Sequence, residues 1–241
     1  MKLSVVIPAF NEERLLGETL ERVQAALKSV HGRGWETEIV VCDNNSTDRT
    51  ASIATQPGVT VVFEPINQIG RARNRGATAA TGDWLLFVDA DSHPSSELLL
   101  DLVDAMEDPR CIGGGANVTF PPGCKKGAKW VRLWNWLSRV TKWAPGSFIF
   151  CRTEAFRTLG GFSRELFISE EIDLSKRLKR LAATRGQRMI ILSRHPLLTS
   201  DRKLGLYSDW EHVKFVWRYF SAPKATSRNR EACDIWYDGR R

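Results

Sequence analysis

The first 110 residues alternate between short, mainly apolar runs and longer segments in which apolar side chains recur every three or four positions. The short runs have the length of buried strands and occupy residues 3–7, 38–42, 59–63 and 84–88. The segments between them, clearest at Leu16, Leu20, Val23 and Leu27, predict amphipathic helices. This order predicts an α/β fold assembled from βαβ units.

Three of the predicted strands run directly into polar segments. Residues 8–13 (PAFNEE) follow the first strand, with Pro8 expected to end it and Asn11 to cap the next helix. Residues 43–48 (DNNSTD) follow the second strand and favour a turn before a helix at 47–54. Asp89 and Asp91 follow the run at 84–88. Open α/β sheets bind ligands beyond the carboxyl ends of their strands, so these loops mark the expected site.

The pattern changes after residue 110. Further strands are expected at 111–120, 148–151 and 189–192, and helices at 95–106, 153–159 and 169–181. Residues 125–143 carry four tryptophans among basic side chains, and apolar residues recur at helical spacings at Trp130, Leu133, Trp134, Leu137 and Val140. Such a helix either packs on the sheet or lies at a membrane interface. The aromatic and basic tail at 206–241 is expected to pack on the domain formed by residues 1–205 or to lie at a membrane surface.

Composition narrows the class of protein. A chain of 241 residues suits one large domain. The net charge of +7 is compatible with phosphate-bearing ligands, but the basic residues are dispersed and no nucleic-acid-binding module is present. The five cysteines form no CxxC pair, and the N-terminus has no signal-peptide pattern. We therefore expect reduced thiols in a cytoplasmic protein, without a spanning helix, that is soluble or peripheral on the inner face of the membrane.

Asp89 and Asp91 are the first candidates for chemistry, because only Ala90 separates them. Two buried carboxylates at this spacing need a counter-charge or a metal. Hard divalent cations that neutralise phosphates prefer carboxylate oxygens. A surface turn with two solvated aspartates also fits the spacing. His195 is a further candidate metal ligand, and an ordinary loop histidine fits its position as well.

Four segments, in this order, resemble family 2 glycosyltransferases. They are VVIPAFNEE (5–13), VCDNNSTDRT (41–50), GRARNRGATAATGDWLLFVDADS (70–92) and FRTLGGFSRELFISEEIDLSKRLKR (156–180). The similarity covers residues 3–182, and TSDRK at 199–203 resembles a phosphate-contacting loop of some members. It implies the GT-A fold, a Rossmann-like mixed sheet with helices on both faces in a single domain. It also implies a nucleotide-diphosphate sugar donor, Mn²⁺ or Mg²⁺, and inverting transfer to a hydroxyl of an unidentified glycan, lipid or small molecule.

The resemblance also assigns roles to individual positions. The implied nucleotide-sugar contacts are Pro8, Ala9, Phe10, Asn11, Glu12, Asp43, Asn45, Arg73, Asp89, Ala90, Asp91 and Arg202. Within that set, Glu12 is expected near the ribose, Asp43 near the base and Asp89 with Asp91 at the metal. Glu170 and Glu171 occupy the position of the family's usual Glu-Asp pair, whose second acid is the catalytic base. This pair ends in glutamate instead, so Glu170, Glu171 and Asp173 all stay candidate bases.

The chemistry of glycosyl transfer suits these residue types. Negative charge builds on the leaving diphosphate, where a cation and arginines stabilise it, and a carboxylate removes the acceptor's proton. Carboxylates at a helix start are also favoured by the helix dipole alone. A sugar-phosphate nucleotidyltransferase is one alternative, but it needs a basic, Gly-rich loop where this chain has PAFNEE. A non-catalytic nucleotide-sugar-binding scaffold is the other, and the full set of carboxylates disfavours it.

Overall fold

The protein is described from a computed structural model that covers residues 1–121, 123–124, 127–200, 202, 210, 214, 217 and 222–233, apart from the side chains of residues 128–130 and 224. The predicted tail at 206–241 therefore falls largely outside the described residues, as do residues 201 and 203 of the TSDRK segment.

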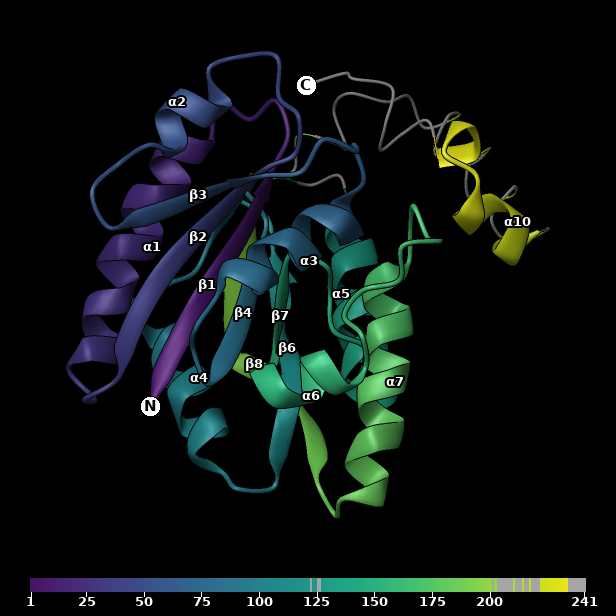
Figure 1. Ribbon diagram of the computed structural model, residues 1–241. Helices are drawn as coiled ribbons and strands as arrows, with labels where there is room; N and C mark the ends of the chain where they lie inside the picture. Colours follow the sequence, from purple (N-terminus) through teal and green to yellow (C-terminus); the bar gives the residue numbers. More distant parts are fainter. Residues whose placement is uncertain are drawn as a thin grey trace.

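Eight strands form one mixed sheet (Figure 1). They are β1 (Lys2–Ala9), β2 (Glu36–Asp43), β3 (Val59–Phe63), β4 (Trp84–Val88), β5 (Ser92–His93), β6 (Cys111–Thr119), β7 (Phe148–Arg152) and β8 (Arg188–Thr199). Their order across the sheet is β3-β2-β1-β4-β7-β6-β8-β5. The first four are mutually parallel, and β7 is antiparallel to both β4 and β6. The carboxyl ends of β1, β2 and β4 thus share one edge of the sheet.

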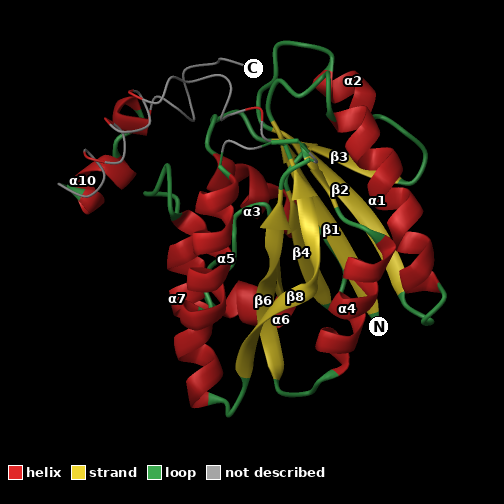
Figure 2. Ribbon diagram, turned by 180° about the vertical axis from the view of Figure 1, so that it is seen from behind, coloured by secondary structure: helices red, strands yellow, loops and turns green. Residues whose placement is uncertain are grey.

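Helices cover both faces of the sheet, as Figures 1 and 2 show from opposite sides. One face packs against α1 (Leu16–His31) and α4 (Ser96–Glu107), and the other against α3 (Ile69–Ala79), α6 (Thr153–Thr158) and α7 (Glu170–Thr184). The remaining helices are α2 (Thr50–Ala54), α5 (Ala128–Thr141), α10 (Pro223–Arg228) and the 3₁₀ turn η1 (Glu231–Cys233). The expected GT-A-type α/β architecture is confirmed.

Strand β4 shows why the sheet is buried on both faces. Trp84, Leu86 and Val88 belong to the core under α1 and α4, whereas Leu85 and Phe87 belong to the core under α3, α6 and α7. All five side chains are buried. A continuous apolar run, rather than an alternating one, is the pattern expected of a central strand covered by helices on both sides.

Two expectations about the first loop are wrong. Strand β1 continues through Pro8 to Ala9, because its pairing with β4 ends at Val6 and the ladder beyond that point tolerates a missing N–H. Asn11 does not cap a helix, since α1 begins at Leu16. Asn11 instead adopts a left-handed φ of 52°, a conformation that asparagine tolerates.

The last strand is longer than its apolar pattern suggests. The prediction ended it at Leu192 and placed His195 in a loop, but β8 extends to Thr199. An irregularity in the β6–β8 register at Ala116–Val118 lets pairing resume at Leu197, and β5 adds a short antiparallel partner at Ser92 and His93. Long-range pairing therefore overrides the polar residues at this strand's centre.

Among the described residues, no helix is both long and apolar enough to cross a bilayer. The short helix α10 contacts the loop before α7: the Phe167 N–H donates to the Ser227 carbonyl oxygen at 2.7 Å, and Arg228 pairs with Glu165 at 2.8 Å. These two contacts join the described part of the tail to the domain.

Candidate functional site

The polar loops at the carboxyl edge of the sheet enclose a cavity of about 550 Å³, within the usual range of small-ligand sites. Ten of the predicted site residues line it: Pro8, Ala9, Phe10, Glu12, Arg73, Asp89, Ala90, Asp91, Glu170 and Glu171. They come from the ends of β1 and β4, from α3 and from the first turn of α7. Acidic residues that are distant in the sequence therefore lie around one cavity.

Arg73 holds the two acidic clusters together. Its side chain is 1% exposed, with Nη1 donating to Glu170 Oε1 at 2.7 Å and Nη2 donating to Asp89 Oδ1 at 2.9 Å. Nη2 also donates to the Gly146 carbonyl oxygen at 2.8 Å, and the guanidinium lies 5.2 Å from the centre of the Phe162 ring. A buried arginine with two carboxylates fixes the geometry of both, because losing either contact leaves an uncompensated buried charge.

Glu170 and Glu171 differ in their contacts although they are neighbours in sequence. Glu170 is buried and its carboxylate accepts from Arg73, whereas Glu171 is half-buried and lines the cavity beside Gly146. Burial raises the pKa of Glu170. Burial, together with the charge of Glu170, raises the pKa of Glu171 above its ordinary value of 4.5. A carboxyl group with a raised pKa in a cleft is the usual state of a general base or acid.

Asp91 lines another part of the cavity, and Arg202 lies beside it outside the lining. Arg202 donates from both terminal nitrogens to Glu12, at 2.8 and 3.0 Å, and Nη2 lies 4.0 Å from Asp91 Oδ2. The predicted phosphate contact of Arg202 is therefore placed next to Asp91. The Glu12 carboxylate, expected near a ribose, is engaged by Arg202 in this structure.

Side-chain hydrogen bonds connect the loops after β1 and β2 and fix their conformation. The Asn11 carboxamide oxygen accepts from the Thr47 N–H at 2.8 Å, and Asp43 Oδ1 accepts from the Ser46 N–H at 3.1 Å. Asn45 donates to Asn67 Oδ1 at 3.1 Å. None of Asn11, Asp43 or Asn45 is among the residues lining the cavity, so these hydrogen bonds shape the loops that carry the lining residues.

Two candidate residues lie elsewhere. The side chain of Asp173 pairs with Arg177 one helical turn further along α7, at 2.7 Å, and does not line the cavity, which removes it as a candidate base. The proposed metal role of His195 is wrong for this structure. Its Nδ1 lies 3.0 Å from Asp101 Oδ2 on α4, outside the cavity lining, because its segment belongs to β8.

The sequence did not identify several residues that line the cavity. Asn44 is the most informative, since its side-chain amide donates to the carbonyl oxygens of Glu64 and Ile66 and its oxygen accepts from the Gln68 N–H. In the sequence, only its position within the polar loop after β2 indicated that Asn44 could line the site. Phe120, Gly146 and Ser147 gave none, because the long excursion between β6 and β7 brings them to the cavity.

The residues present fit a divalent cation bound together with a diphosphate. Asp89 and Asp91 both line the cavity and supply carboxylate oxygens, the ligand type that Mg²⁺ and Mn²⁺ prefer. Within the described part of the chain no three His, Cys, Asp or Glu side chains are grouped as a metal site. Two carboxylates match sites in which substrate phosphates and water complete the coordination.

Comparisons with known proteins agree with this architecture. The profile of glycosyl transferase family 2 matches residues 4–162, so the chain belongs to that family. An uncharacterized glycosyltransferase of Mycobacterium tuberculosis is 34% identical over 105 residues, which is 44% of each chain. The alignment thus spans less than half the length of this curated relative.

Two solved structures share the fold. Residues 1–349 of S. aureus TarS in complex with UDP-GlcNAc align with a TM-score of 0.66 and 21% identity, covering 98% of this chain and 69% of that one. The mannosyltransferase PcManGT of Pyrobaculum calidifontis, in complex with GDP-Man and Mn²⁺, aligns with a TM-score of 0.65 and 22% identity, covering 96% and 64%. At these identities the similarity establishes the fold.

Proposed function

We propose that this protein transfers a sugar from a nucleotide-diphosphate donor to an acceptor hydroxyl, with inversion at the anomeric carbon and with Mn²⁺ or Mg²⁺ as cofactor. The observation that carries the proposal is the pairing of two acidic clusters in one cavity, with Asp89 and Asp91 on one side, Glu170 and Glu171 on the other, and Arg73 bridging them. Family membership and the Mn²⁺ and nucleotide-sugar complexes of structural neighbours support it.

Glu171 is the proposed base. Its carboxylate accepts the acceptor's hydroxyl proton while the acceptor oxygen bonds to the anomeric carbon and the bond to the diphosphate breaks. With no enzyme nucleophile in this step, the anomeric centre inverts. Glu170 accepts from Arg73 and Asp173 accepts from Arg177, whereas Glu171 lines the cavity outside these two pairs.

The nucleoside diphosphate leaves from the opposite side of the cavity. A divalent cation held by Asp89 and Asp91 would supply neutralisation of its developing charge. Arg202 lies beside Asp91 and contributes positive charge to the same region. Arg73 keeps the Asp89 carboxylate in position and separates it from Glu170.

Donor binding tests the metal role. We expect Asp91→Ala to abolish Mn²⁺-dependent binding of nucleotide sugars, measured by calorimetry over a panel of donors. Asp173→Ala is the matched control, because this carboxylate pairs with Arg177 at the surface of α7. Unchanged Mn²⁺-dependent binding in Asp91→Ala would contradict the assignment. Donor hydrolysis in the presence of Mn²⁺ separates an enzyme from a non-catalytic scaffold.

A further inference from the structure

Helix α5 presents two different faces. On its inner side, Val131 and Trp134 pack against the core, and the Asn135 carboxamide bonds both backbone groups of Val118 on β6, at 2.9 and 3.0 Å. On its outer side, Leu133, Trp136 and Val140 are 52%, 55% and 61% exposed. The helix is therefore anchored to the sheet by one face while large apolar side chains on the other face meet solvent.

The outer face also carries positive charge. Arg132 and Arg139 are exposed on the same side of the helix as these apolar side chains. At about 3.6 residues per turn, Arg139, Arg132, Trp136, Val140 and Leu133 fall in that order within about a third of the circumference. One margin of this face is basic, its centre is a tryptophan and its other margin is aliphatic. We call these five residues the α5 outer face.

Basic residues of the neighbouring helix α7 add to the positive charge of the α5 outer face. Lys176 lies over the Trp143 ring at 4.9 Å and Lys179 donates to the Thr141 carbonyl oxygen at 3.2 Å, so the exposed side of α7 adjoins the end of α5. Arg180 is exposed on α7 as well. Residues 128–141 contain no acidic residue, and the acids of α7 all lie in its first turn. Helices α5 and α7 therefore contribute basic and no acidic side chains to this part of the described surface.

We propose that the α5 outer face docks on the surface of an anionic lipid bilayer. A helix that exposes tryptophan and aliphatic side chains beside arginines matches the chemistry of the interface, where aromatic rings sit among headgroups and arginines meet lipid phosphates. The helix is about 21 Å long at 1.5 Å per residue, too short to span, and lies in the plane of the surface.

The charge pattern distinguishes a bilayer from a second copy of this chain. In a two-fold dimer the same face meets itself, so the arginines of both copies would be brought into one interface in which α5 supplies no acidic partner. An anionic surface removes that repulsion and attracts the basic residues that lie near it.

Docking would place the cavity near the bilayer. The α5 excursion leaves the sheet after β6 and returns before β7, and Phe120 at its start and Gly146 at its end both line the cavity. If α5 were bound to the membrane, it would fix the distance between this side of the cavity and the lipid headgroups. The docking itself requires no sugar transfer, so its test is independent of the proposed activity.

The test uses the full chain and vesicles of phosphatidylcholine, with or without about 30% phosphatidylglycerol. We expect co-sedimentation with the anionic vesicles and much less with the neutral ones. Two double variants, Trp136→Ser with Val140→Ser and Arg132→Gln with Arg139→Gln, should each lower the partition coefficient about tenfold. Raising salt to about 0.5 M should weaken binding of the wild type and change the arginine variant less.

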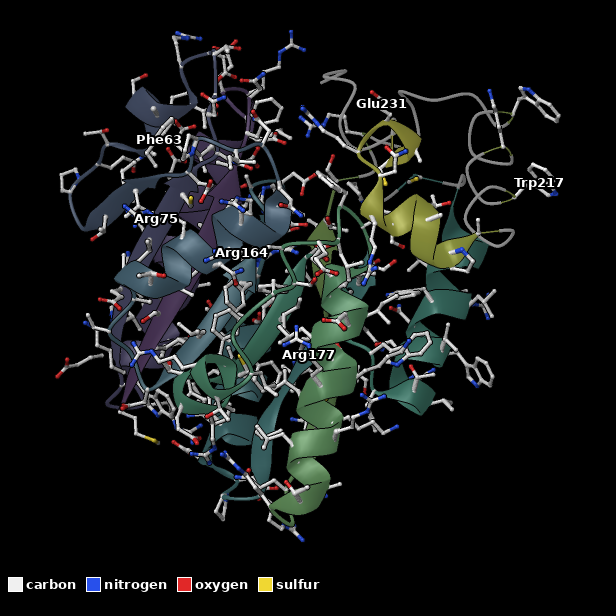
Figure 3. The ribbon with its side chains drawn as sticks, turned by 45° about the vertical axis from the view of Figure 1, so that its right-hand side comes forward. Phe63, Arg75, Arg164, Arg177, Trp217 and Glu231 are labelled. Atoms are coloured by element: carbon white, nitrogen blue, oxygen red, sulfur yellow. The ribbon has the colours of Figure 1, made fainter. Side chains whose placement is uncertain are left out.

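Matched controls lie at β3 and α1, away from α5 in Figures 1 and 2. Phe63→Ser with Ile66→Ser removes two apolar side chains that are 51% and 50% exposed, and Figure 3 shows Phe63 on β3 at the margin away from α5. Arg14→Gln with Lys28→Gln removes two exposed basic residues at α1. Both controls should bind vesicles as the wild type does. All variants are first checked for an unchanged melting temperature, because exposed sites tolerate substitution.

Three results would overturn the proposal. One is a wild-type chain that ignores anionic vesicles. Another is equal loss of vesicle binding in the α5 variants and the controls. The third is a concentration-dependent dimer, seen by sedimentation, that Trp136→Ser with Val140→Ser abolishes in a chain that binds no vesicles, which would make the α5 outer face a self-association surface.

Discussion

The two ends of the parallel strands place a half-buried glutamate in opposite electrostatic surroundings. At the amino end, Glu38 accepts hydrogen bonds from Ser4 and Thr81 and pairs with Lys2 at 2.8 Å. Burial alone would raise the pKa of Glu38, but these contacts outweigh it and lower the pKa to about 2. At the carboxyl end, burial and the neighbouring Glu170 raise the pKa of Glu171.

The difference separates a structural acid from a reactive one. The charged form of Glu38 is matched by several donors, so its ionisation stabilises the fold. At the other end, Arg73 pairs with Glu170 and Asp89. Ionisation of Glu171, at the cavity wall, therefore remains unfavourable. A carboxyl group whose ionisation is unfavourable in a cleft is typical of functional sites, where a ligand rather than the fold interacts with its charged form.

The largest expected effect is on transfer. Glu171→Gln removes the proton acceptor without changing the size of the side chain, so we expect the rate of transfer to fall about 10²–10⁴-fold while donor binding stays intact. Steady-state rates and calorimetry measure the two quantities. Glu38→Gln is the control at the other end of the sheet and should leave the rate near the wild-type value. Full activity in Glu171→Gln would move the base to Glu170.

The second effect is on stability at the cavity. Arg73→Met leaves Glu170 and Asp89 without their buried partner, which should cost about 3–5 kcal/mol of unfolding free energy in urea. Arg75→Met, two residues along the same helix, removes an exposed side chain and should change stability by less than about 0.5 kcal/mol. Equal losses in the two variants would show that Arg73 has no special role in joining the acidic clusters.

A third effect is expected at the amino end. Glu38→Gln keeps the shape but removes the charge, and should cost about 1–2 kcal/mol near neutral pH. The pKa of Glu38 is lowered in the folded protein. The charge of Glu38 therefore stabilises the fold at pH values above its pKa in the unfolded chain, and this stabilisation is lost as the pH falls towards about 2. The difference between variant and wild type, followed by denaturation at several pH values, should shrink with acidification. A difference independent of pH would refute this origin.

The fourth effect, also on stability, has the opposite sign. The pKa of Glu171 is raised in the folded protein. At pH values below its pKa in the unfolded chain, Glu171 does not destabilise the fold, and stability is lost as the pH rises through its pKa in the folded protein. Glu171→Gln cannot ionise and should therefore be more stable than the wild type by a margin that grows with pH over that window. Melting temperatures of the metal-free proteins across the pH range give this margin. A margin that stays constant or shrinks would contradict the raised pKa.

The site can be traced to short-range signals in the sequence to a large extent. Apolar runs with polar ends predicted β1, β2 and β4 and the loops that follow them, because a strand's apolar pattern and its terminating polar residues are encoded locally. The resemblance to a family then selected the cavity-lining residues Glu12, Arg73, Asp89, Asp91 and Glu171 from many acidic and basic candidates.

Tertiary structure decided which of these side chains have partners. Nothing in the spacing distinguishes Glu171 from Asp173, yet the Arg177 contact engages one and the cavity receives the other. His195 was misplaced because β8 gains its length from pairing with β6 and β5, strands far away in sequence. In the same way, helical periodicity showed that α5 is amphipathic, but only its packing against β6 determined that Trp134 points inward and Trp136 meets solvent. Periodicity is a property of neighbouring residues, whereas burial and charge pairing depend on contacts between distant segments.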